Sequence, residues 1–137
     1  MSQENVDVVL RIHAAFSRGD LDGLLAECHP DATYRAAITQ AVEGEAGDFR
    51  GHTGIRRWWL ELHSLYEDLH TDVLEVRDLG ERAVVVYVIH GRAKGSGLAF
   101  EEGQELAQVV TLRNRKAAEV RDYLSRTEAL EAVGLRE

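Results

Sequence analysis

The stretch Arg82–His90 reads RAVVVYVIH, and its unbroken apolar run decides the fold class. Valine, isoleucine and tyrosine favour strands, so this stretch is expected to be one. A strand that is apolar on both faces has to be covered on both faces. Helices can cover one face, and a second subunit can cover the other. We therefore expect a homodimer formed through the outer, convex face of the sheet.

Turn signals on both sides of this strand divide the second half of the chain into hairpins. Short turns are expected at 80–81, 95–97 and 114–116, and neighbouring strands joined by such turns pair antiparallel. A further short strand is expected at 32–37, followed by a loop at 38–50 with two glycines and several acids. The other expected strands are 69–79, 82–94, 98–113 and 117–124.

Helical periodicity is confined to the first half of the chain and to its end. Apolar residues at three- and four-residue spacing predict helices over 3–17 and from 21 to Cys28, which is expected as a small core residue. Pro30 stops the second helix. A third helix over 53–67 carries a stripe that ends at Tyr66, and Ser125 can cap a short closing helix.

These elements predict an α+β fold of one domain over residues 1–137. The sheet is expected to be strongly curved, cone-shaped and mostly antiparallel, with the three helices of the N-terminal half over its concave face.

Composition excludes several classes of function. The chain has 137 residues and a net charge of −8, which disfavours nucleic acid as a partner because phosphate binding needs a positive surface. No window approaches the roughly 18 apolar residues of a membrane span, so no membrane is expected as a partner. The start of the chain shows no signal-peptide pattern, and we expect a cytoplasmic protein. One cysteine allows no internal disulfide.

Four short motifs resemble the nuclear transport factor 2-like superfamily and, within it, the SnoaL-like, ketosteroid-isomerase-like group. They are FSRGDL at 16–21, HPDA at 29–32, FRGHTGIRRWW at 49–59 and DYLSRTEAL at 122–130. The resemblance covers nearly the whole chain. It implies a cystatin-like or ketosteroid-isomerase-like roll with an internal pocket, as one SnoaL-like domain. It does not imply one activity, because this fold serves enzymes, binders and assembly domains.

The acid–base residues of two known branches fall on unreactive side chains here. Matching with the steroid isomerases puts their tyrosine at Ile12 and their base at Ala36, and neither side chain can exchange a proton. Matching with the polyketide cyclases puts their acid at Gln108, whose amide can hold a carbonyl but is no general acid at neutral pH. Limonene-epoxide-hydrolase-like chemistry needs an Asp-Arg-Asp arrangement around a water molecule. Only parts of this arrangement could be supplied here, by Arg35, Glu105 and Asp122.

The remaining candidates for a site are polar and aromatic residues expected on the concave face. Asp122 and His13 are candidates for acid–base catalysis. The candidates for ligand binding are Tyr34, Trp58, Trp59, Leu62, Tyr87, Gln108 and Tyr123. No metal site is expected, because the histidines lack the spacing of metal ligands, and no cofactor is expected.

We therefore expect a SnoaL-like protein with a pocket for a small apolar or oxygenated ligand, as an isomerase-, hydrolase- or cyclase-type enzyme. The alternative is a non-catalytic module for binding a small molecule or for dimerisation, and the unreactive positions favour it.

Overall fold

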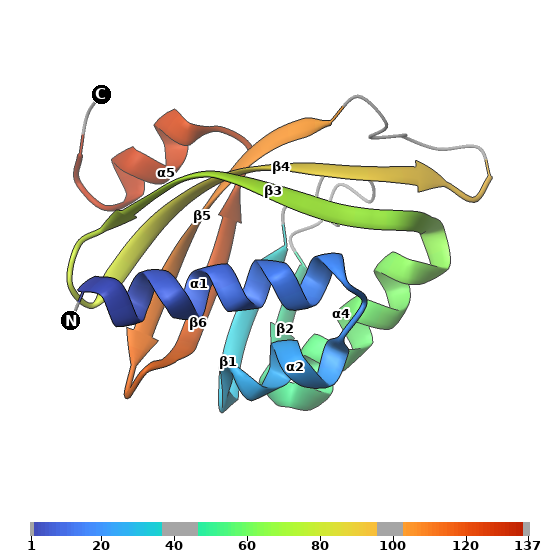
Figure 1. Ribbon diagram of the computed structural model, residues 1–137, viewed down its shortest axis with the longest axis horizontal. Coiled ribbons are helices and arrows are strands. Elements are labelled where there is room, and N and C mark those ends of the chain that lie inside the picture. The colour runs from blue at the N-terminus through green and yellow to red at the C-terminus, as the bar shows by residue number, and fades with distance from the viewer. Residues whose placement is uncertain (1, 37–46, 96–102, 136–137) are drawn as a thin grey trace.

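Four helices and six strands make up the part of the chain that the computed structural model describes, residues 2–36, 47–95 and 103–135 (Figure 1). In chain order they are α1 (Ser2–Ser17), α2 (Leu21–Ala26), β1 (Cys28–Ala36), β2 (Gly47–Arg50), α4 (Gly51–Leu65), β3 (Tyr66–Asp78), β4 (Arg82–Ala93), β5 (Gln104–Arg113), β6 (Lys116–Tyr123) and α5 (Arg126–Ala132).

The strands form one sheet in the order β2-β1-β6-β5-β4-β3. All neighbouring pairs are antiparallel except β1 and β6, which are parallel. The sheet is strongly curved, and α1, α2 and α4 lie in its hollow (Figure 1). The α+β fold with a mostly antiparallel, cone-shaped sheet and three covering helices is therefore confirmed.

Irregular pairing along β3 accounts for part of the curvature. Its register with β4 shifts between Glu67 and His70 and again between Val73 and Glu75. Asp68 within the first shift has a φ of 56°. Such bulges bend a strand and increase its twist, so β3 wraps around α1 instead of running flat.

The end of α1 and the start of α2 follow the local sequence. Gly19 has a φ of 72°, a conformation that glycine adopts without steric cost and that ends the first helix. The side chain of Asp20 then accepts a hydrogen bond from the backbone N–H of Gly23 at 2.8 Å, and so caps α2.

Three local predictions were wrong in their boundaries. Cys28 does not lie on a helix but begins β1, because it pairs with Ala117 of β6. Pro30 lies within this strand, where the register shifts because proline has no N–H to donate. Part of the expected loop, Gly47–Arg50, is strand β2, which pairs with β1. Tyr66 begins β3 instead of continuing the third helix.

Some predictions concern residues outside the described ranges. These are most of the loop over 38–50, the greater part of the turn at 95–97 and the first residues of the strand expected from 98.

The two faces of the central strands have different covers. Val85 and Tyr87 face the helices in the hollow, whereas Val84 and Val86 belong to a second cluster with Ala129 and Leu130 of α5. The apolar outer face for which we expected a second subunit is thus covered in part by the closing helix of the same chain. Val88, further along β4, is only half-buried.

No helix in the described ranges has the length and apolar character needed to cross a membrane.

Candidate functional site

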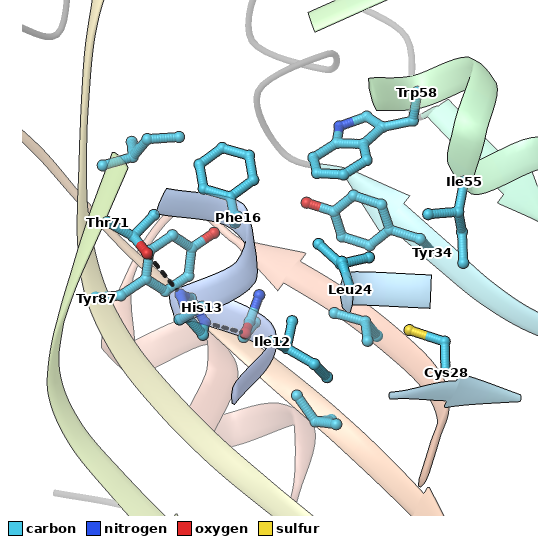
Figure 2. A pocket seen from close by; sticks show the side chains of 14 residues that line it. Ile12, His13, Phe16, Leu24, Cys28, Tyr34, Ile55, Trp58, Thr71 and Tyr87 are labelled. Carbon is cyan, nitrogen blue, oxygen red and sulfur yellow. Dashed lines mark hydrogen bonds between the residues drawn. The ribbon is translucent and has the colours of Figure 1, made fainter. Parts of the chain in front are cut away.

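A cavity of about 70 Å³ lies between the helices and the concave face of the sheet (Figure 2). Most of its wall is apolar or aromatic. The apolar part of the wall comprises Ile12, Phe16, Leu24, Cys28, Ile55, Trp58, Ile89, Val110 and Val120. The hydrogen-bonding side chains of the wall are His13, Tyr34, Thr71, Tyr87 and Gln108.

A row of hydrogen bonds joins α1 to three strands beneath this cavity. His13 Nδ1 lies 2.8 Å from Thr71 Oγ1 on β3, and His13 Nε2 lies 2.8 Å from Gln108 Oε1 on β5. Gln108 Nε2 in turn donates to Asp122 Oδ1 on β6 at 2.9 Å. Tyrosine, tryptophan and cysteine aside, the buried polar side chains in the described ranges are these three, His13, Gln108 and Asp122.

This row fixes the tautomer of His13. The amide nitrogen of Gln108 donates to a carboxylate, so its oxygen faces His13 and requires a donor there. Nε2 therefore carries a proton, and in the neutral ring Nδ1 accepts from the Thr71 hydroxyl. Burial lowers the pKa of His13, although its hydrogen bond to Gln108 opposes this effect, and the ring is therefore neutral at neutral pH.

Two tyrosines meet the other end of the row. The Tyr34 hydroxyl donates to Asp122 Oδ2 at 2.5 Å. The pKa values of Tyr34 and Tyr87 are raised well above the usual value. Burial is the largest cause, followed by the negative charge of Asp122, and the hydrogen bonds to Asp122 add to it. Both phenols therefore stay protonated and can act as donors. Figure 2 shows the two hydroxyls pointing toward the space between their rings.

Trp58 contributes its ring to the wall rather than its N–H. Its Nε1 is buried and has no hydrogen-bond partner in the described part of the chain. The Trp58 ring contacts Tyr34 edge to face, with centroids 4.7 Å apart, and stacks beside Phe16 at 6.0 Å. The cavity is thus bordered by a continuous aromatic surface from α1, β1 and α4.

The structure brings together six of the nine residues proposed from the sequence. His13, Tyr34, Trp58, Tyr87 and Gln108 line the cavity, and Asp122 lies directly behind the two phenols.

The other three proposed residues lie elsewhere. Trp59 is buried and stacks on His63, with centroids 4.4 Å apart, and Leu62 lies in the same helix-side core. Tyr123 packs against the α5 cluster on the opposite face of the sheet, because neighbouring residues of a strand point to opposite faces.

Sequence reasoning did not single out Thr71 and Phe16 as site residues. Thr71 sits opposite Ile89, which faces the cavity, but strand alternation alone does not show that its hydroxyl meets His13. Phe16 was expected within the first helix and at the start of the motif at 16–21, without a role in a site. Of the unreactive matched positions, Ile12 and Gln108 line the cavity, and Ala36 is fully buried.

Within the described ranges, no group of three or more histidine, cysteine, aspartate or glutamate side chains is arranged to hold a metal ion.

Comparison with known proteins agrees with this fold. The family model of the SnoaL-like domain matches residues 9–120. No curated protein matches the chain at a significant level. Among solved structures, an NTF2-like protein from Burkholderia xenovorans LB400 is 30% identical, with a TM-score of 0.71 and 96% of each chain covered. An NTF2-like protein of unknown function from Burkholderia pseudomallei K96243 is 22% identical, with a TM-score of 0.76 and 96% of this chain and 98% of that chain covered.

A third similar structure comes from Catenulispora acidiphila DSM 44928. It is a protein with a ketosteroid isomerase-like fold in complex with trimethylamine, 20% identical, with a TM-score of 0.74 and 93% of this chain and 92% of that chain covered. The matched family model spans most of the chain, and the fold and the solved structures agree with it. The chain therefore belongs to the SnoaL-like domain family of the nuclear transport factor 2-like superfamily.

Proposed function

We propose that this protein binds a small molecule in the cavity beneath α1 and α4. The observation that carries the proposal is the contrast within the wall. Apolar and aromatic side chains form most of it, and the polar side chains converge on the buried carboxylate of Asp122. Ligand sites typically combine a largely apolar wall with a few convergent polar groups that fix orientation. In this proposal, Tyr34 and Tyr87 orient the polar end of the ligand.

The size of the cavity supports a ligand with few non-hydrogen atoms. Its volume of about 70 Å³ is roughly half of the ~150 Å³ of an engineered apolar cavity that takes up benzene. A larger ligand would have to displace side chains of the wall. The trimethylamine complex of the Catenulispora acidiphila protein supports the same size class.

Binding without catalysis accounts best for the hydrogen bonds of the row. Both nitrogens of His13 are engaged, so it offers no lone pair to a ligand. Gln108 separates His13 from Asp122, and an amide does not pass protons between them as an acid would. The row therefore holds α1 against the sheet and keeps the floor of the cavity rigid.

A ligand screen by protein-observed NMR tests this proposal. The panel contains alcohols, ketones and amines of four or five non-hydrogen atoms, and shifts are expected at the cavity-lining residues. Tyr34→Phe removes a hydroxyl from the cavity, whereas Tyr123→Phe removes one from the opposite face. Binding should weaken in the first variant and stay within twofold in the second. Absence of binding by every panel member, or equal effects of the two variants, would refute the proposal.

An acid–base enzyme of the isomerase, hydrolase or cyclase type is the second candidate. It is favoured by Asp122, a buried carboxylate that a ligand in the cavity reaches through the Tyr34 hydroxyl. In that case Asp122→Asn should abolish turnover of a panel ligand without abolishing its binding. Unchanged ligands after prolonged incubation with the wild-type protein would eliminate this candidate.

We further propose that the protein is a homodimer in the cytoplasm. The part of the outer sheet face beyond α5, near the half-buried Val88, is the surface that a second copy would cover. Sedimentation velocity at micromolar concentration should show a dimer that Val88→Glu dissociates. A monomer at every concentration would contradict the dimer, and fluorescence microscopy of a tagged chain tests the location.

A further inference from the structure

We propose that the ligand is a small organic cation, an ammonium group carrying methyl or other short alkyl substituents. This inference rests on the proposed function, because it assigns a chemical class to the occupant of the same cavity. Two independent features carry it: the aromatic composition of the wall and the sign of the charge behind it.

The aromatic feature is the set of rings that meet at the cavity. Phe16 comes from α1, Tyr34 from β1, Trp58 from α4 and Tyr87 from β4. The face of an aromatic ring carries partial negative charge, and tryptophan attracts cations most strongly. Trp58 lines the cavity while its Nε1 is hidden, so its ring, and not its N–H, is what a ligand meets. Figure 2 shows the rings of Phe16, Trp58 and Tyr34 close to one another among the side chains that line the cavity.

The electrostatic feature is the carboxylate at the polar end. Three neutral groups surround Asp122: the Gln108 amide donates to it, Tyr34 donates to it, and Tyr87 is hydrogen-bonded to it. An arrangement of donors around a carboxyl group fits its ionised form, because a carboxylate accepts and does not donate. The negative charge of Asp122 therefore lies directly behind two side chains that line the cavity, Tyr34 and Tyr87.

No positive side chain opposes this field at the cavity. Among the described residues that line it there is no lysine or arginine. His13, the one histidine among them, is buried, and burial lowers its pKa, which favours the neutral ring. A cation entering the cavity therefore meets aromatic rings and has the Asp122 carboxylate behind two of them, and both attract positive charge.

The desolvated, mostly apolar wall selects among cations. A bare ammonium or metal ion loses strong hydration when it enters such a site, and the wall cannot replace it. Alkyl groups spread the charge, weaken the hydration and pack against Ile12, Ile55 and Val110. The cavity volume of about 70 Å³ admits a tetramethylammonium-sized group more readily than a ring system.

A pair of probes that differ in charge but little in shape tests the inference. Tetramethylammonium chloride and tert-butanol are titrated into the protein, with sodium chloride at equal ionic strength in every sample. We expect tetramethylammonium to bind at least about tenfold more tightly, the preference that a desolvated cation–aromatic contact supports. Binding is followed in every variant by protein-observed NMR at the cavity-lining residues.

Two variants then locate the preference. Trp58→Phe should weaken tetramethylammonium binding at least about threefold more than it changes tert-butanol binding, because phenylalanine attracts cations less strongly. Trp59→Phe is the matched control, since Trp59 stacks on His63 and does not line the cavity. Asp122→Asn should remove most of the preference for the cation. If Asp122→Asn does not fold, Trp58→Phe with its control still decides the question.

The outcomes separate this inference from the proposed function. If tert-butanol or neutral panel ligands bind as well as tetramethylammonium or better, the cation inference is overturned and the binding function stands. If tetramethylammonium binds preferentially but Trp58→Phe and Trp59→Phe lower its affinity equally, the cation site is not this cavity and the inference is overturned. If no probe and no panel ligand binds, both proposals fail together.

Discussion

The hydrogen bond between His13 and Gln108 allows a quantitative test of the row beneath the cavity. Gln108 is 6% exposed and makes two side-chain hydrogen bonds, one to His13 and one to the Asp122 carboxylate. A neutral hydrogen bond contributes about 0.5–1.5 kcal/mol and one to a charged group about 1.5–3 kcal/mol. Gln108→Leu, which keeps most of the volume, should therefore lower the free energy of unfolding by about 3 kcal/mol.

The coupling between the two side chains is the more specific quantity. His13→Leu deprives Gln108 Oε1 of its donor, so each single substitution leaves a buried polar group of the other residue unsatisfied. The double substitution His13→Leu/Gln108→Leu removes both groups, and the loss should fall short of the sum of the single losses by about 1–2 kcal/mol.

Urea unfolding of the four proteins, followed by far-ultraviolet circular dichroism, measures this coupling. A loss of about 3 kcal/mol corresponds to a midpoint lower by roughly 1–2 M urea. Gln104→Leu on the same strand is the control, because Gln104 is exposed, and its effect should stay within about 0.5 kcal/mol. Additive losses, within about 0.5 kcal/mol, would show that the two side chains are not coupled and would refute the row as described.

Three further predictions concern titration, reactivity and a turn. Because burial lowers the pKa of His13 in the folded state, the unfolded chain binds the extra proton first, and stability should fall below about pH 6.5 by at most about 1.4 kcal/mol per pH unit. Unfolding midpoints of the wild-type protein, measured between pH 8 and 5, should show this fall. The fall should be smaller in His13→Leu, and an equal fall in the two proteins would contradict the prediction. Burial raises the pKa of Cys28 to about 11, so a thiol reagent at pH 8 should modify it only after urea is added, and rapid reaction of the native protein would count against this. Arg115 has a φ of 65° and follows Asn114 with a φ of 52°, and a positive φ strains a residue that has a Cβ. Arg115→Gly should therefore raise the free energy of unfolding by about 0.5 kcal/mol, measured by thermal unfolding. A lower free energy of unfolding would show that this strain is absent.

Much of the fold could be predicted because its signals are local. The period of the apolar residues in α1, the glycine at 19 with the cap at Asp20, and the turn at Asn114 and Arg115 are each set by a few neighbouring residues. The boundaries that failed were those that strand pairing decides. Cys28 joins the sheet because it pairs with β6, and Gly47 joins it because it pairs with β1. The residues next to Cys28 or Gly47 in the sequence do not indicate these pairing partners, which lie elsewhere along the chain.

The sequence by itself determined the class of the protein: a curved sheet with helices in its hollow, the SnoaL-like family, and the absence of an acid at Gln108. Alternation along a strand also predicted that Gln108 points inward. The tertiary structure alone decided what Gln108 touches, since His13, Asp122 and Tyr34 come from different elements and meet only when the sheet curves around α1. It also decided which tryptophan lines the cavity. Trp58 and Trp59 are adjacent on one buried helix face. Only the position of α4 over β1 decides that Trp58 lines the cavity whereas Trp59 packs in the core against His63.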